Sequence, residues 1–235
     1  MSLFDTVREY SQDIFRNIRG IKVSQDLFDD LSDDPLNWDA ANTIESHTHP
    51  VLTHQSLIQR AFDYSKNDFI DYPFENITSS RYSDGSMACW YGSETLNTTI
   101  YETRYHFVQE IKDSWDIFQN QETVIIDRRV AKIYCQGLGL DLTEKKEEFP
   151  WLIDPNNYTP CQEIGRRVAQ EGHPLLIVPS ARQPQGVNLV VFNPNVLSNP
   201  REFCRLQYVF DVKKRKIQCI RGENEVLLEP SEVDI

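Results

Sequence analysis

Residues 80–108, SRYSDGSMACWYGSETLNTTIYETRYHFV, combine a strand pattern with a helix pattern. The apolar run 89–91, closed by Gly92, predicts a short strand. Ser93, with an acidic residue directly behind it, predicts a helix N-terminus, because a hydroxyl caps the first turn and a negative charge suits the helix dipole. The helix is expected to run to about residue 112. A strand leading directly into a helix favours a mixed α+β fold.

Glu102 lies on this expected helix, away from the apolar side. The apolar stripe consists of Leu96, Ile100, Phe107 and Ile111. At about 100° per residue, Glu102 lies about 150° from the centre of that stripe. Its carboxylate is therefore free to face a ligand instead of the core behind the helix.

Upstream of this stretch the chain changes character several times. Apolar residues recur at three- and four-residue steps in residues 2–18, which predicts a helix. An acidic segment follows at 26–39, with a solvated surface as its simplest interpretation. Residues 56–62 predict a strand that carries Arg60, and residues 63–80 predict a long loop.

Downstream, strands outnumber helices. The apolar run 175–178 predicts a buried strand, which ends at Pro179 and Ser180. The other expected elements are strands at 123–126, 131–142 and 188–192, a helix at 161–171 ended by Gly172, a hairpin at 206–220 and an acidic tail at 222–235.

Composition and charge limit the classes of function. Hydrophobic residues make up 40% and charged residues 26%, as in ordinary globular proteins. The formal net charge of -12 argues against direct binding of nucleic acid or an anionic membrane, because both are polyanions. The five Cys form no CxxC pair and predict reduced thiols in a cytoplasmic protein. The N-terminus lacks a signal peptide pattern, and no stretch reaches the roughly 18 apolar residues of a membrane span.

Polar residues from distant segments suit one kind of ligand. Arginines can bind a pyrophosphate through paired hydrogen bonds, a tyrosine can stack on a flat ring, and a carboxylate can bind ribose hydroxyls. Taken singly, each residue also has a plain structural interpretation, as an ion-pair, core or turn residue. The residues in question are Arg60, Arg81, Tyr82, Tyr91, Glu102 and Ser180.

Three stretches together resemble the motifs of RES-domain proteins. Residues 57–60 (LIQR) resemble the first strand of the family, and residues 80–108 its core signature with an Arg–aromatic pair, a Tyr and a helical Glu. Residues 157–191, NYTPCQEIGRRVAQEGHPLLIVPSARQPQGVNLVV, resemble its second signature of helix, strand, Pro-Ser and an Asn that opens the next strand. The resemblance covers about residues 51–200 and implies an ADP-ribosyltransferase-like mixed sheet core. Together with the patterns above, it predicts a helical acidic extension at 1–50, a RES catalytic domain at 51–221 and an acidic C-terminal tail at 222–235.

The resemblance also implies a chemistry and a set of site residues. It implies cleavage of the nicotinamide–ribose bond of NAD+, with NAD+ as substrate, inorganic phosphate as co-substrate, and neither a cofactor nor a metal. Arg60, Glu102 and Ser180 are the catalytic residues that it implies. Arg81, Tyr82 and Tyr91 are the substrate-binding residues.

Three activities stay open at this stage. The first is phosphorolysis of NAD+ to nicotinamide and ADP-ribose-1″-phosphate, or hydrolysis with water as acceptor. The second is mono-ADP-ribosylation of a target protein, and the third is a non-catalytic binding module on the same fold. The resemblance further implies a toxin that is neutralised by an Xre-like antitoxin protein, while self-association of the chain stays open.

A zinc site is a weaker interpretation. His47, His49 and His54 follow Glu45, but their spacing matches no zinc motif, and a solvated loop is the better prediction. Gly137 and Gly139 lack the remainder of a dinucleotide fingerprint.

Overall fold

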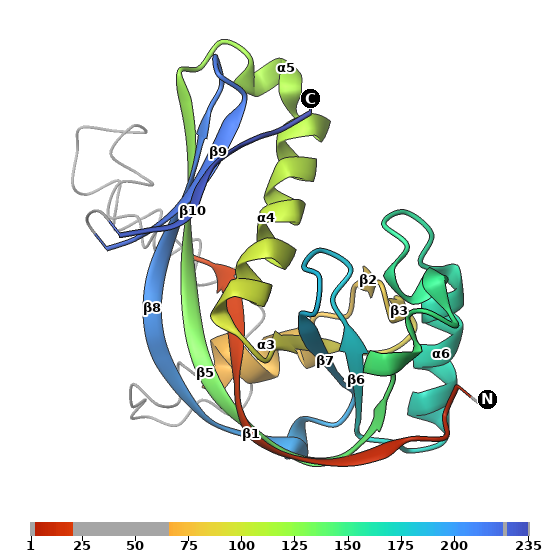
Figure 1. The fold of residues 1–235 in the computed structure, drawn as a ribbon. Helices are drawn as coiled ribbons and strands as arrows, with labels where there is room; N and C mark the ends of the chain where they lie inside the picture. Colours follow the sequence, from red (N-terminus) through yellow and green to blue (C-terminus); the bar gives the residue numbers. More distant parts are fainter. Residues whose placement is uncertain (1–2, 21–65, 223–224, 235) are drawn as a thin grey trace, which may run out of the picture. The chain divides into compact units, whose positions relative to one another are not determined.

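The computed structural model of the chain describes residues 3–20, 66–222 and 225–234. Their fold is mixed α+β, as predicted, and the main sheet has the strand order β1-β4-β7-β6-β5-β8-β9-β10 (Figure 1). The strands of this sheet are β1 (Val7–Arg19), β4 (Trp90–Ser93), β5 (Thr123–Asp141), β6 (Leu175–Pro179), β7 (Val187–Val191), β8 (Leu197–Asp211), β9 (Lys216–Arg221) and β10 (Glu225–Glu232).

The remaining described elements are short, apart from two helices. A two-stranded sheet consists of β2 (Ser79–Ser80) and β3 (Ser83–Asp84). The helices are η1 (Asn67–Asp71), α3 (Tyr72–Glu75), α4 (Leu96–Asp113), α5 (Trp115–Phe118), η2 (Thr143–Lys145), η3 (Pro150–Ile153), α6 (Thr159–Gln170) and η4 (Pro194–Val196). None of these described helices is long and apolar enough to cross a membrane.

Strand β5 organises the main sheet. One of its edges pairs with β1 from Val7↔Leu140 to Arg19↔Arg128. Its other edge pairs first with β8 and then, in parallel, with β6. Because β1 also pairs with β4, the strands β1, β4, β7, β6 and β5 close into a ring. A cluster of buried apolar side chains from these strands fills this part of the core: Tyr10, Ile14, Trp90, Ala131, Ile133, Cys135, Leu175, Ile177, Leu189 and Val191.

Helix α4 covers the other half of the sheet. Figure 1 shows it lying along β5, β8 and β9. Thr95, rather than the predicted Ser93, caps the helix, because the Thr95 side chain accepts a hydrogen bond from Thr98 N at 3.0 Å. Ser93 instead belongs to β4. The predicted apolar face of the helix is confirmed, because Ile100 and Ile111 of the stripe are buried against β8 and β9. Burying such a side chain contributes about 1.5–3 kcal/mol.

Helix α6 covers β6 and β7 and fixes the segment that follows β2. Its residues Cys161, Ile164 and Val168 join a cluster with apolar residues of β6 and β7. Gly165 has no room for a side chain, because a Cβ there would lie 1.9 Å from the carbonyl oxygen of Tyr82. The close approach of α6 therefore determines where the Arg81–Tyr82 backbone lies.

The predicted N-terminal helix at residues 2–18 is wrong, because Val7–Arg19 form β1. Residues four positions apart, such as Tyr10 and Ile14, lie on the same face of a helix and also on the same face of a strand. The spacing of the apolar residues therefore did not distinguish a helix from a strand. The thirteen-residue pairing with β5 decides in favour of the strand. Residues 7–19 therefore belong to the main sheet and not to a helical extension.

Three further predictions need correction. Residues 225–232 are a strand paired with β9 instead of a free tail. The predicted loop 63–80, where it is described, contains η1, α3 and β2. The two strands predicted at 123–126 and 131–142 are the single strand β5. The predictions of α6 with Gly172 behind it, β6, β7 and the β8–β9 hairpin are confirmed.

Candidate active site

Glu102 receives hydrogen bonds from two residues that lie far away in the sequence. Ser180 Oγ donates to Glu102 Oε1 at 2.6 Å, and Asn188 Nδ2 donates to the same oxygen at 2.7 Å. Ser180 directly follows β6 and Asn188 lies in β7, and these strands are antiparallel neighbours. The helix face predicted for Glu102 is thus turned toward the carboxyl end of β6.

The Ser180 hydroxyl is oriented by the turn in which it lies. Its oxygen accepts hydrogen bonds from Arg182 N at 3.1 Å and from Gln183 N at 3.0 Å. The turn is closed by Ser180 N, which donates to Gly186 O at 2.8 Å. Since a hydroxyl has one proton and two lone pairs, its bonding capacity is filled and its proton is directed at Glu102. This geometry suits a residue that holds the carboxylate better than it suits a nucleophile.

Asn188 and Ser93 extend the cluster beyond the predicted residues. Ser93 Oγ donates to Asn188 Oδ1 at 2.7 Å, which leaves the amide nitrogen of Asn188 to donate to Glu102. Asn188 is the Asn that opens the strand after Pro-Ser in the second signature. This position in the motif could have indicated that Asn188 belongs to the site. The sequence offered no comparable signal for Ser93, which was predicted as a helix cap.

Tyr91 and Tyr82 support the β2–β3 hairpin. Tyr91 Oη accepts a hydrogen bond from Tyr82 N at 2.9 Å and shares another with Ser80 Oγ at 2.8 Å. Burial raises the pKa of Tyr91 above its ordinary value. The Tyr82 ring is enclosed in the core beside α6, with 1% of its surface exposed. The Tyr82 side chain thus packs beneath the hairpin, and its substrate-binding role stays a prediction.

Arg81 lies against the loop between η3 and α6. Its Nη1 donates to Asp154 O at 2.7 Å, and its guanidinium lies 4.3 Å from the centre of the Tyr158 ring. Asp154 accepts hydrogen bonds from the backbone of Asn157 and Asn156, which lowers the pKa of its carboxyl group, and Arg81 adds to this effect. The predicted Arg81 side chain is therefore held by Asp154 O and by the ring of Tyr158, which lies at the start of the second signature.

Arg182 is a second guanidinium in the same neighbourhood. Its Nη2 donates to Pro155 O and to Tyr158 Oη, each at 3.1 Å, and its guanidinium lies 3.3 Å from the centre of the Tyr105 ring. Within the described ranges, neither Arg81 nor Arg182 forms an ion pair with a carboxylate. In this part of the chain, the contacts of both guanidinium groups are with carbonyl oxygens, a hydroxyl group and aromatic rings.

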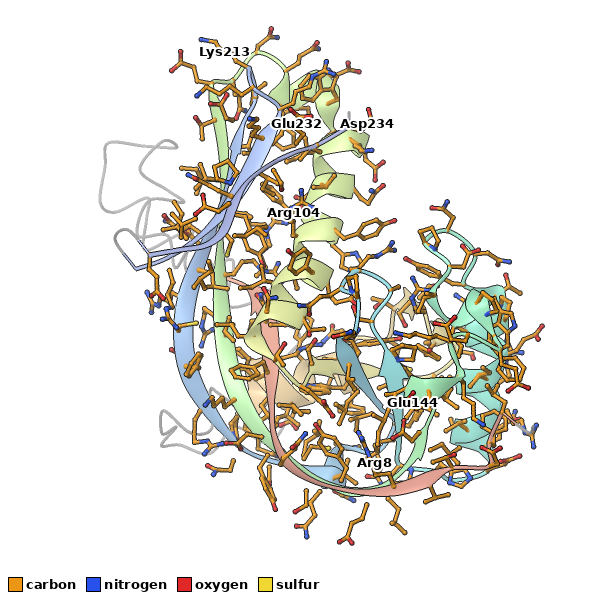
Figure 2. All side chains as sticks on the ribbon, in the orientation of Figure 1. Arg8, Arg104, Glu144, Lys213, Glu232 and Asp234 are labelled. Carbon is orange, nitrogen blue, oxygen red and sulfur yellow. The ribbon has the colours of Figure 1, made fainter. Side chains whose placement is uncertain are left out.

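His106 lies one helical turn after Glu102. Although its side chain keeps an exposed surface, desolvation by the surrounding protein lowers its pKa. Glu102 opposes this effect, whereas Arg182 and Arg81 add to it. His106 thus lies within electrostatic range of Glu102 and of Arg182, Arg128 and Arg81. Arg104, in contrast, donates to Ser231 Oγ on β10, and its side chain lies on the β10 side of α4 (Figure 2).

Some predicted residues fall outside the described part of the chain. Arg60 is one of them, and the histidine-containing segment 45–54 is another. In the part that the structure describes, no cluster of three or more residues could hold a metal ion. The five Cys, all of which are described, are free thiols.

Comparison with known proteins identifies the family. The RES domain matches residues 52–211, and the chain belongs to the RES-domain family. Toxins of this family act on NAD+, so membership places the chain among NAD+-acting enzymes. One similar solved structure is the M. tuberculosis MbcT–MbcA toxin–antitoxin complex, with a TM-score of 0.46 and 13% identity over 84% of this chain and 86% of that chain. No curated protein matches the sequence.

Proposed function

We propose that this protein is a toxin that phosphorolyses NAD+ to nicotinamide and ADP-ribose-1″-phosphate. The observation that carries the proposal is the convergence of Ser180 and Asn188 on Glu102 Oε1, at 2.6 and 2.7 Å. Among the described residues, all hydrogen bonds to this side chain go to Oε1 and none to Oε2. The carboxylate is thereby fixed in direction while it retains acceptor capacity for a substrate.

Glu102 supplies the main catalytic contribution. When the nicotinamide–ribose bond breaks, the ribose gains positive charge, and inorganic phosphate forms the new bond to the anomeric carbon. A carboxylate that is already oriented stabilises this charge more in the transition state than in the ground state. Ser180 and Asn188 hold the carboxylate. Because phosphate attacks the anomeric carbon directly and nicotinamide leaves with the electron pair of the broken bond, no protein residue needs to form a covalent bond with the substrate.

Arg81 binds the pyrophosphate of NAD+, together with Arg60. A guanidinium has five N–H donors and can form paired hydrogen bonds with a phosphate. Asp154 O uses one donor of Arg81 in the present geometry, at 2.7 Å. Tyr91 contributes by holding the hairpin that carries Arg81, through its bond with Tyr82 N.

The experiment that tests the activity is incubation of the purified protein with NAD+, with and without inorganic phosphate. We expect nicotinamide and ADP-ribose-1″-phosphate, separated by chromatography, only when phosphate is present. Free ADP-ribose at an equal rate in both samples would instead indicate hydrolysis. A discrete protein carrying an added ADP-ribose mass, in a lysate treated with enzyme and NAD+, would indicate protein ADP-ribosylation.

The role as a toxin needs a separate test, because turnover alone does not establish it. Family membership supports a protein antitoxin of Xre type as partner of this chain. Expression of the wild-type chain should stop growth and lower cellular NAD+, and co-expression with such an antitoxin should restore both. Normal growth with unchanged NAD+, despite soluble expression, would contradict this part of the proposal.

A further inference from the structure

Arg182 is in contact with both parts of the candidate site. Its backbone N–H donates to Ser180 Oγ at 3.1 Å, and Ser180 in turn donates to Glu102. Its side chain donates to Tyr158 Oη at 3.1 Å, and the Tyr158 ring supports the Arg81 guanidinium at 4.3 Å. A continuous series of contacts therefore runs from the carboxylate of Glu102 to the guanidinium of Arg81.

The loop around Tyr158 is well constrained by its own hydrogen bonds. Asp154 Oδ1 accepts from Asn156 N and Asn157 N, both at 2.8 Å, which folds the loop into an Asx turn. Pro155 O at the centre of the turn accepts from Arg182 at 3.1 Å. This loop presents a carbonyl oxygen and an aromatic face to Arg81, so it fixes both the position and the plane of the guanidinium.

Helix α4 orients Arg182 from the other side. The Arg182 guanidinium lies over the ring of Tyr105, which is three residues after Glu102 on the same helix. Side chains three positions apart lie on neighbouring parts of one helix face. The helix that carries the carboxylate therefore also aligns the arginine that reaches toward the loop.

We propose that Tyr158 and Arg182 are positioning residues that set the separation between the Arg81 guanidinium and the Glu102 carboxylate. This inference rests on the proposed function, in which Arg81 binds the pyrophosphate and Glu102 faces the nicotinamide ribose. The two residues thereby hold the pyrophosphate-binding group and the carboxylate in a fixed relation to each other. Tyr158 acts through Arg81 and has no contact of its own with the reacting bond.

This assignment predicts a specific kinetic pattern. Pyrophosphate contacts are made equally in the ground state and in the transition state, so weakening them raises KM and leaves kcat nearly unchanged. Tyr158→Phe retains the ring and loses the hydroxyl, and we expect KM for NAD+ to rise about threefold. Tyr158→Leu loses both, and we expect a rise of about tenfold with kcat within about twofold of wild type.

The decisive experiment combines Tyr158→Leu with Arg81→Ala and measures KM and kcat for NAD+ in the wild type, both single variants and the double variant. If Tyr158 acts through Arg81, Tyr158→Leu raises KM less than about twofold in the Arg81→Ala background. Arg167→Gln is the matched control, because Arg167 is an exposed arginine on α6 that pairs with Glu171. This control should show wild-type kinetics.

The possible results separate the inference from the proposed function. A full tenfold effect of Tyr158→Leu in the Arg81→Ala background would overturn the positioning role and indicate direct contact with NAD+. An unchanged KM for Tyr158→Phe, with an unchanged thermal unfolding temperature, would overturn the contribution of Arg182 through the Tyr158 hydroxyl. Absence of NAD+ turnover by the wild type would overturn the proposed function, and the inference with it.

Discussion

Glu102 and Thr103 are neighbours on α4 and belong to two very different polar clusters. Consecutive helix residues point about 100° apart, so the two side chains face different surroundings. Glu102 meets Ser180 and Asn188 at the carboxyl end of β6. Thr103 points toward the sheet, where it meets Asn17 and Tyr208 at 3.0 and 2.7 Å.

The Thr103 cluster is enclosed and its groups are paired with one another. Asn17 Nδ2 donates to Thr103 Oγ1 and to Tyr208 Oη, while Asn17 Oδ1 accepts from Arg128 Nε at 2.9 Å. Tyr208 is fully buried, and burial raises its pKa to about 12. Burial also lowers the pKa of Arg128.

The difference between the clusters indicates different roles. In the Thr103 cluster, donors and acceptors are matched within the protein, so the cluster contributes to the stability of the sheet–helix interface. In the Glu102 cluster, two donors converge on a single oxygen of a half-buried carboxylate. Such an arrangement orients a charge for a ligand, and it should matter for turnover more than for folding.

The largest effect is expected for Glu102→Gln. The amide oxygen can still accept from Ser180 and Asn188, but the negative charge is lost. NAD+ turnover should fall at least about 100-fold, because the developing charge on the ribose loses its counter-charge. The thermal unfolding temperature should change little. Wild-type turnover by this variant would remove Glu102 from the mechanism.

For Asn17→Ala we expect a large loss of stability with little change in turnover. This change leaves Arg128 without its side-chain acceptor and deprives Thr103 and Tyr208 of a donor. The free energy of unfolding should decrease by ~2–4 kcal/mol, as measured by urea denaturation. Turnover per folded molecule should stay close to wild type. Gln136→Ala, at an exposed position on β5, is the control and should have almost no effect on stability.

The smallest effect is a pH dependence that arises from His106 at the edge of the Glu102 cluster. Its folded-state pKa lies below the ordinary value, mainly through desolvation, so the unfolded chain takes up a proton more readily than the folded chain. Stability should therefore decrease as the pH falls through and below about 6.5. His106→Gln should be more stable relative to wild type at pH 5 than at pH 8, in thermal unfolding curves. An equal difference at both pH values would contradict the lowered pKa.

Local patterns carried enough information for the elements that bear the central site residues. The stripe through Ile100 and Ile111 identified α4, and the apolar run before Pro179 identified β6, so Glu102 and Ser180 could be placed on correct elements. That the two side chains meet across 78 residues of sequence followed only from the family resemblance. Helical periodicity shows which way Glu102 points but not what lies opposite.

Other parts could not be predicted because their structure depends on distant partners. Residues 7–19 become a strand through pairing with β5, more than a hundred residues later. Tyr158 and Arg182 are ordinary loop residues in the sequence, and their role arises only where the loop 154–158 meets the turn after β6. The hydrogen bonds of Asn188 with Ser93 and Glu102 likewise join three separate elements.

The ring of strands has a practical consequence for anyone who prepares this protein in parts. The family match begins at residue 52 and ends at residue 211, whereas β1 precedes this range and β9 and β10 follow it. A fragment trimmed to the matched residues would expose the edge of β5 along its pairing with β1 and the edge of β8 along its pairing with β9. Unpaired strand edges of this length recruit other chains, so such a fragment should self-associate or precipitate.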